Sequence, residues 1–319
     1  MTWFKLVIFL GHLFLYKPRL TAGNDWSYNT HEKGRGPDYW SHIHQVCSGF
    51  EQSPVNIDTE FMVYDTTLAY FNFTEYAHKQ GVHQILSTIN VITAVITYSG
   101  HKILLRGGSL PQDFTLYQVH FHWDPRSVHS GSEHAINGRR YGMEMQIIHY
   151  RSDYRSLNQA IQQKFSVAIV SFLFKVVHEV NPALDKLLKY LPNLTQHNST
   201  YVHEFSLYDL LPSTEKMNFY RYEGSLTYPP CSETVIWSVA EPLINISKSQ
   251  LEQFYQFNPN TFKSLHNNRA IQPLNGRIVL TTKVNQRTRK SKNGAGTRAS
   301  VCQKLLSSAL VLAVSWVSL

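Results

Sequence analysis

The chain has 319 residues, of which 43% are hydrophobic, 13% aromatic and 16% charged. This composition can form a large packed core, and it excludes a disordered chain, a coiled coil and a collagen-like chain. The formal net charge of +8 is compatible with a nucleic-acid partner, an anionic membrane, or segments that are removed from the mature protein.

The first residues have the layout of a secretory signal peptide. An apolar stretch, 6–16, follows Lys5, and the small residues Ala22 and Gly23 come next. A basic start, an apolar run and small residues in this order predict removal of residues 1–22 and an extracellular location. An amphipathic first helix is the alternative, but no polar face recurs along the stretch.

Strand patterns dominate the middle of the chain. Residues 85–110 are rich in apolar and β-branched residues and predict two or more strands, with a turn at 99–100. Segments 114–123 and 143–150 predict two further strands. The near-continuous apolar run 165–177 is expected of a strand that is buried on both faces.

Helical patterns are short and few. Residues 182–190 begin with a proline, which suits a first helical turn, and 247–257 begin with a capping-box sequence. No internal repeat is visible. We therefore expect one large, mainly β (α+β) domain over residues 23–284.

The last residues predict a lipid-anchor signal. The apolar run 305–319 has 15 residues, whereas a membrane-spanning helix needs about 20. Small residues beginning at Asn293 and a polar spacer of 9 residues, 296–304, precede this run. The order predicts a glycosylphosphatidylinositol (GPI) anchor on Asn293, removal of 294–319, and a basic stalk at 285–293. A tail docked against the domain is the alternative.

Removal of both ends changes the meaning of the net charge. The two segments hold five basic and no acidic residues, so the formal charge falls from +8 to +3. Four of the remaining basic residues lie in the stalk, at Arg287, Arg289, Lys290 and Lys292. Beside a membrane anchor, this run favours a solvated or lipid-facing segment over nucleic-acid binding.

The cysteines and glycosylation sequons agree with an extracellular location. Cys302 lies in the removed tail, which leaves Cys47 and Cys231 as one possible pair in an oxidising compartment. The four sequons begin at Asn72, Asn193, Asn198 and Asn245. Each sequon alone is a weak signal, but four of them behind a signal peptide support secretion.

Two histidines form a pattern that can bind a metal ion. His120 and His122 lie in a predicted strand, where alternate side chains point to the same face about 7 Å apart. Two imidazoles placed in this way can share a zinc ion, although ordinary packing produces the same pattern. A third ligand would come from a neighbouring strand.

The strand at 143–150 offers candidates for that third ligand on each of its faces. Glu144 and Gln146 share one face, and His149 lies on the other. The alternation of the strand does not by itself choose between the two faces.

Five separated motifs resemble the α-class carbonic anhydrase family. They are QSPVNID (52–58), QVHFHW (118–123), GSEH (131–134), GSLTYPPCSETVIW (224–237) and NNRAIQPLNGR (267–277). Their order and spacing hold from about Trp26 to Val284, which is nearly the whole mature chain. The resemblance implies a central, mostly antiparallel, twisted sheet of ten strands with short helices around it, and zinc at the base of a funnel. It also implies a disulfide between Cys47 and Cys231.

The resemblance assigns the metal ligands. His120 and His122 match the first two zinc ligands, and Gln146 stands where the family has a third histidine. This assignment places His149 on the wrong face. The side chains that hold the ligands in place are matched by Gln118, Glu144 and Asn267.

The resemblance also assigns the residues around the substrate. Thr227 matches the hydroxyl that orients the reacting hydroxide, and Glu133 matches the carboxylate that orients this hydroxyl. The apolar wall beside carbon dioxide is matched by Ile148, Ile169, Leu226 and Trp237. Two further departures accompany Gln146: Asn90 replaces the proton-shuttle histidine, and Tyr228 stands where the family has a smaller residue.

These departures define two hypotheses. An amide oxygen is a poorer zinc donor than imidazole, so we expect Gln146 to weaken zinc retention, and Asn90 cannot carry a proton near pH 7. The first hypothesis is a zinc-dependent, extracellular enzyme that reversibly hydrates carbon dioxide to bicarbonate, weakened at Gln146. The second is an acatalytic relative that has lost zinc and serves as a cell-surface binding module, with a protein partner that the sequence does not identify.

Overall fold

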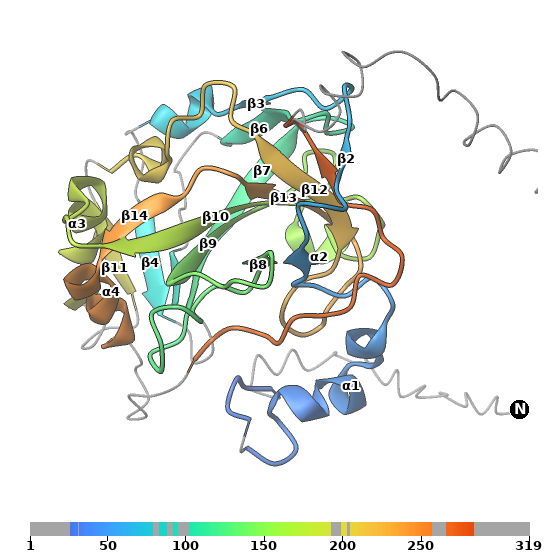
Figure 1. The fold of residues 1–319 in the computed structure, drawn as a ribbon, viewed down its shortest axis with the longest axis horizontal. Coiled ribbons are helices and arrows are strands. Elements are labelled where there is room, and N and C mark those ends of the chain that lie inside the picture. The colour runs from blue at the N-terminus through green and yellow to red at the C-terminus, as the bar shows by residue number, and fades with distance from the viewer. Residues whose placement is uncertain are drawn as a thin grey trace, which may run out of the picture.

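One large sheet forms the centre of the fold in the computed structural model (Figure 1). The strands along its main path, in spatial order, are β11 (Ser199–Val202), β4 (His83–Ser87), β5 (Ile92–Ala94), β7 (Phe114–Trp123), β9 (Met143–Arg151), β10 (Val167–Val177), β13 (Val235–Ala240), β12 (Phe219–Gly224), β15 (Leu280–Thr281) and β2 (Val63–Tyr64). The strands that pair alongside are β3 (Phe71–Asn72), β6 (Leu104–Gly107) and β14 (Ile244–Ser247), and a separate parallel pair joins β1 (Asn56–Ile57) to β8 (Ala135–Ile136). Along the main path only β10–β13 and β15–β2 are parallel. The mostly antiparallel sheet of ten strands is therefore confirmed.

These elements belong to the part of the chain that the structure describes. It comprises residues 26–30, 32–78, 83–87, 92–94, 102–192, 199–202, 205–256 and 266–283. The predicted signal peptide, the stalk at 285–293, the tail at 294–319 and the turn at 99–100 lie outside these residues. Within them, no helix has the length and apolar character needed to cross a membrane.

Short helices surround the sheet. The α-helices are α1 (Trp40–Ile43), α2 (Leu157–Ala160), α3 (Pro182–Leu188) and α4 (Lys248–Tyr255), and the 3-10 helices are η1 (Pro37–Tyr39), η2 (Gln45–Ser48), η3 (Thr74–Ala77) and η5 (Leu207–Leu210). As predicted, a proline occupies the first turn of α3, and Ser247 and Gln250 form a reciprocal capping box at the start of α4. Figure 1 shows α3 and α4 together at one end of the sheet and α1 apart from them.

Strand β9 lies between β7 and β10 and separates two hydrophobic cores. Met145 and Ile147 belong to the core on one face, and Ile148 belongs to the core on the other. Because strand side chains alternate, Gln146 shares the face of Ile148. The antiparallel register places Gln146 directly opposite His120 on β7. The predicted strands at 114–123, 143–150 and 165–177 are thus confirmed, and together they position the candidate site.

A disulfide ties the N-terminal part of the domain to the loop between β12 and β13. Cys47 of η2 and Cys231 are joined with an S–S distance of 2.04 Å, which confirms the expected pair. Both cysteines pack in a small cluster with Tyr28 and Trp40. The loop that carries Thr227 is therefore fixed to a second, distant segment of the chain.

Candidate metal centre and substrate pocket

The two histidines of β7 each have one ring nitrogen held by the protein. The Nε2–H of His120 donates to Oε1 of Gln118 at 2.9 Å, and the Nδ1–H of His122 donates to the main-chain oxygen of Asn267 at 2.6 Å. Oxygen acceptors fix the ring protons on these nitrogens, so the other nitrogen of each ring carries a lone pair. The expected support by Gln118 and Asn267 is present, although Asn267 acts through its main chain.

The remaining nitrogens are buried and make no hydrogen bond to the described residues, although His122 Nε2 lies 3.7 Å from Oε2 of Glu133. His120 Nδ1 and His122 Nε2 have no hydrogen-bond partner within the described part of the chain, and the ring centroids lie 6.3 Å apart. Burial, with a smaller contribution from neighbouring His122, lowers the pKa of His120 to about 3. His120 therefore stays neutral, and neutral imidazole is the form that ligates metal ions.

Gln146 donates its amide group to two buried carboxylates. Its Nε2 lies 2.7 Å from Oε2 of Glu133 and 3.0 Å from Oε1 of Glu144. Burial by itself would raise the pKa of Glu144, but the charge and hydrogen bonds of His134, with a hydrogen bond from Ser171, lower it to about 2. Glu144 is thus a stable anion that accepts a hydrogen bond from the Gln146 amide.

Glu133 does not hold Thr227 in this structure, contrary to the expectation from the resemblance. One oxygen of Glu133 accepts from the main-chain N–H of Arg269 at 2.9 Å, and the other accepts from Gln146. The Thr227 hydroxyl is buried without a partner among the described residues. The physical reason is that an amide has two N–H hydrogens, whereas a histidine whose other nitrogen binds metal has one. The additional N–H of Gln146 reaches Oε2 of Glu133 and would compete there with a bond from Thr227.

The donor set fits a zinc ion, although its third member is weak. Two imidazole lone pairs have no partner, and none of the hydrogen bonds among the described residues ends on Oε1 of Gln146. Zinc accepts nitrogen and oxygen donors of this kind in tetrahedral sites. The described residues contain no group of three or more His, Cys, Asp or Glu side chains arranged for a metal. Were zinc bound here, an amide oxygen would have to serve in place of a third imidazole.

The expected apolar wall is assembled across three strands. Register places Ile169 of β10 beside Ile148 of β9 and beside Trp237 of β13. Leu226, which precedes Thr227, belongs to the same buried hydrophobic cluster. The Trp237 indole N–H donates to the oxygen of Ser225 and so avoids an unpaired buried donor. A dry, apolar surface thus adjoins the Thr227 loop.

Aromatic side chains cover His120, and this arrangement was not predicted. The Tyr228 ring lies 5.5 Å from the His120 ring and stacks on Trp26 at 5.9 Å with an interplanar angle of 19°. Trp26 in turn packs edge-on against Tyr28 and Trp40. The departure at Tyr228 was visible in the sequence, but its partner Trp26 lies about two hundred residues away and carried no signal.

Two histidines outside the metal centre have structural roles. His134 links Oε1 of Glu144, at 2.8 Å from its Nδ1, to the Tyr222 hydroxyl, at 2.7 Å from its Nε2. His149 lies on the opposite face of β9 from Gln146, where its Nδ1–H donates to the oxygen of Ala168. The rejection of His149 as a metal ligand is therefore consistent with its position.

Sequence reasoning gave Arg269 no role, although it lies within one of the five motifs. Besides its main-chain bond to Glu133, its guanidinium donates to Oε1 of Gln52 and to the oxygens of Ser53 and Cys47. Arg269 thus connects the carboxylate of the site to the segment that carries the disulfide.

Two of the four predicted glycosylation sites lie within the described residues. Asn72 on β3 and Asn245 on β14 are exposed, as a glycan would require. The remaining predicted positions, Asn193, Asn198, the shuttle position Asn90 and the anchor site Asn293, lie outside the described residues.

Known proteins resemble the chain over most of its length. The family model for the eukaryotic-type carbonic anhydrase matches residues 35–283. Carbonic anhydrase 4 of Rattus norvegicus is 34% identical over 271 residues, which cover 81% of this chain and 85% of the relative. Carbonic anhydrase 1 of Mus musculus is 32% identical over 265 residues, or 81% and 98% of the two chains. Carbonic anhydrase 15 of Mus musculus is 31% identical over 273 residues, or 82% and 84%.

Proposed function

The chain belongs to the eukaryotic-type carbonic anhydrase family, and on that basis we propose that it is a weak, zinc-dependent carbonic anhydrase of the cell surface. Its reaction is the reversible hydration of carbon dioxide to bicarbonate. His120, His122 and the amide oxygen of Gln146 would hold zinc. The observation that carries the proposal is the pair of buried imidazole lone pairs without partners, beside a Thr227 hydroxyl that also has none in the described structure.

Zinc, when bound, lowers the pKa of water to about 7 and so supplies hydroxide, an effect for which carbonic anhydrase itself is the standard example. Gln118 and Asn267 each accept a hydrogen bond from one ring nitrogen of a histidine. The lone pair of each histidine is therefore on the other ring nitrogen, where it can bind zinc. The Thr227 hydroxyl is free to orient the nucleophile. The wall of Ile148, Ile169, Leu226 and Trp237 excludes water and accepts carbon dioxide, which is apolar.

Two features make the proposed reaction slow. Gln146 is a poorer zinc donor than imidazole and also occupies Glu133, so the Thr227 hydroxyl is not held in one orientation. Asn90 cannot take up a proton, so each turnover must deliver its proton to buffer instead. The expected enzyme has low zinc occupancy and a rate that rises with buffer concentration.

The cell-surface location completes the proposal. Removal of residues 1–22 would direct the chain to the secretory route, and a GPI anchor on Asn293 would retain it at the membrane. The Cys47–Cys231 disulfide and the exposed sequon residues Asn72 and Asn245 support an oxidising, extracellular environment.

One observation favours a second candidate function. The Gln146 amide satisfies both buried carboxylates without a metal ion, so the polar network is stable as it stands. In this alternative the protein is an acatalytic, cell-surface binding module that has lost zinc, and its protein partner is unknown.

Zinc content and carbon dioxide hydration of the full mature chain separate the two candidates. Both are compared between the native protein, Gln146→His, and the matched control Gln162→His at an exposed position. We expect Gln146→His to bind zinc at least about 100-fold more tightly, the upper end of what losing a supporting residue costs. A native protein that is zinc-free and inactive, beside a loaded and active Gln146→His, would exclude the enzyme and leave the binding module. Zinc and activity in the native protein would establish the enzyme.

A further inference from the structure

An apolar patch surrounds the free edge of the sheet, away from the metal centre. Four of its side chains are unusually accessible for their type: Phe61 is 79% exposed, Ile278 62%, Val63 47% and Tyr64 39%. We call these four residues the apolar edge patch. Val63 and Tyr64 form β2, which ends the main path of the sheet.

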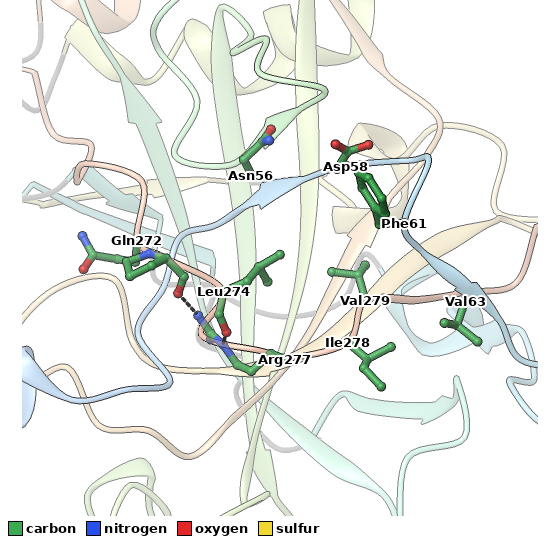
Figure 2. A pocket seen from close by; sticks show the side chains of 10 residues that line it. Asn56, Asp58, Phe61, Val63, Gln272, Leu274, Arg277, Ile278 and Val279 are labelled. Atoms are coloured by element: carbon green, nitrogen blue, oxygen red, sulfur yellow. Dashed lines mark hydrogen bonds between the residues drawn. The ribbon is translucent and has the colours of Figure 1, made fainter. Parts of the chain in front are cut away.

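A groove opens between members of this patch. It has a volume of about 510 Å³, and Phe61, Val63 and Ile278 line it together with Leu274 and Val279 (Figure 2). A surface of this kind, with large apolar side chains around a groove, is typical of an interaction site rather than of ordinary solvent-exposed surface.

The polar side chains of the groove already bond to the protein itself. Arg277 directs its guanidinium to four main-chain oxygens, those of Gln52, Glu223, Pro273 and Leu274. Asp58 accepts from the N–H of Glu60, and the amide of Gln272 donates to the oxygen of Ala270. The groove therefore suits an apolar occupant better than a small polar ligand.

The patch lies where the chain leaves the domain toward its proposed anchor. Leu280 and Thr281 of β15 pair with Val63 and Tyr64, and the described chain ends at Lys283. Only ten residues, 284–293, separate this point from the proposed anchor site at Asn293. At most about 36 Å can be spanned by ten residues, so a membrane anchor would keep the patch close to the bilayer.

We propose that the apolar edge patch rests on the extracellular leaflet of the membrane, with Phe61 and Ile278 inserted among the lipids. This inference rests on the proposed C-terminal anchor. The anchor would hold the patch at a high local concentration near the lipids. A few apolar side chains would then suffice for membrane contact, although they would bind a membrane only weakly by themselves. The four basic residues at 287–292 suit the phosphates of the same surface.

The charges around the patch agree with the extracellular side of the membrane. Asp58 lines the groove, Glu60 directly precedes Phe61 in the chain, and both carboxylates would be repelled by anionic lipid. Anionic lipids concentrate in the cytoplasmic leaflet, so these carboxylates do not oppose contact with the outer one. Contact there would restrict the orientation of the domain at a part of the sheet that is separated along the strand order from β7 and β9.

A lipid-soluble, carbene-generating photolabel tests the proposal on the full chain displayed by cells. Peptides that contain Phe61 to Tyr64 and Ile278 are expected to carry several-fold more label than the peptide that contains Val180. Val180 is 52% exposed and therefore matches Val63, but it follows β10 at another part of the surface. Phe61→Ser combined with Ile278→Ser is expected to remove this excess, whereas Val180→Ser leaves it unchanged.

Phospholipase release of a parallel sample reports the anchor independently. Patch labelling with release supports both the membrane contact and the anchor. Patch labelling without release supports the contact but contradicts the anchor. Release of a protein whose patch carries no more label than Val180 overturns the contact alone. A chain that is neither labelled nor membrane-bound overturns both.

Discussion

Competition between Gln146 and Thr227 for Glu133 predicts an energetic coupling that a double-mutant cycle can measure. In Gln146→Leu the buried Oε2 of Glu133 loses its 2.7 Å donor. A hydrogen bond to a charged group contributes about 1.5–3 kcal/mol, so without a replacement donor the free energy of unfolding would fall by about 2 kcal/mol, and a new bond from Thr227 should offset part of this loss. The lost bond to Glu144 contributes less, because Ser171 and His134 also donate to that carboxylate.

Thr227→Val should behave differently in the two backgrounds. In the native protein the Thr227 hydroxyl has no partner among the described residues, so its removal should change stability by no more than about 0.5 kcal/mol. In Gln146→Leu the hydroxyl is free to donate to Glu133, and its removal should then cost about 1–2 kcal/mol. The expected coupling between the two positions is therefore about 1–2 kcal/mol.

Urea denaturation with a zinc chelator present and the disulfide intact measures all four proteins of the cycle. Thr234→Val is the matched control, because the Thr234 hydroxyl is likewise buried without a partner in the described structure and lies outside the Gln146 network. This control should be close to neutral in both backgrounds. Equal costs of Thr227→Val with and without Gln146 would mean that removing Gln146 does not change the bonding of Thr227 to Glu133, which would refute the competition.

Two further predictions concern acid stability and access to the metal centre. Burial lowers the pKa of His120 to about 3 and that of His149 to about 4, against 6.5 when unfolded. These histidines therefore stabilise the chelator-treated protein fully above pH 6.5, and each contribution is lost at about 1.4 kcal/mol per pH unit as the pH falls below that value. A urea midpoint that stays constant between pH 6.5 and pH 4 would contradict this. Tyr228→Thr should let a chelator remove zinc several-fold faster, because the ring lies against His120, and an unchanged removal rate would show that Tyr228 does not restrict access.

Local patterns in the sequence predicted most of the framework of the site. The apolar run at 143–150 placed Gln146 on the same strand face as Ile148, and the register with β7 then brought it opposite His120. The proline and capping-box signals located α3 and α4 to within a few residues. These features could be predicted from the sequence because strand alternation and helix capping depend on residues that are neighbours in the chain.

Contacts between distant segments could not be predicted in the same way. The resemblance predicted that Glu133 accepts a hydrogen bond from Thr227. Whether it does so depends on the second N–H of Gln146, and this effect appears only where the segments that carry Glu133, Gln146 and Thr227 come together in the fold. Likewise, Trp26 and Tyr228 stack from opposite ends of the domain. The exposure of Phe61 was not visible either, because a lone phenylalanine in a sequence is more often buried.

The exchange of histidine for Gln146 that the resemblance implies would act on both sides of the metal-binding equilibrium. As a ligand, the amide oxygen lowers the affinity of the loaded state. As a donor, the amide nitrogen forms hydrogen bonds to two buried carboxylates, which stabilises the metal-free state. Only the free-energy difference between the two states sets zinc affinity, so both effects reduce it. Because neither a neutral histidine nor a glutamine carries a charge, the exchange would leave the ionised state of Glu144 to its bonds with His134 and Ser171.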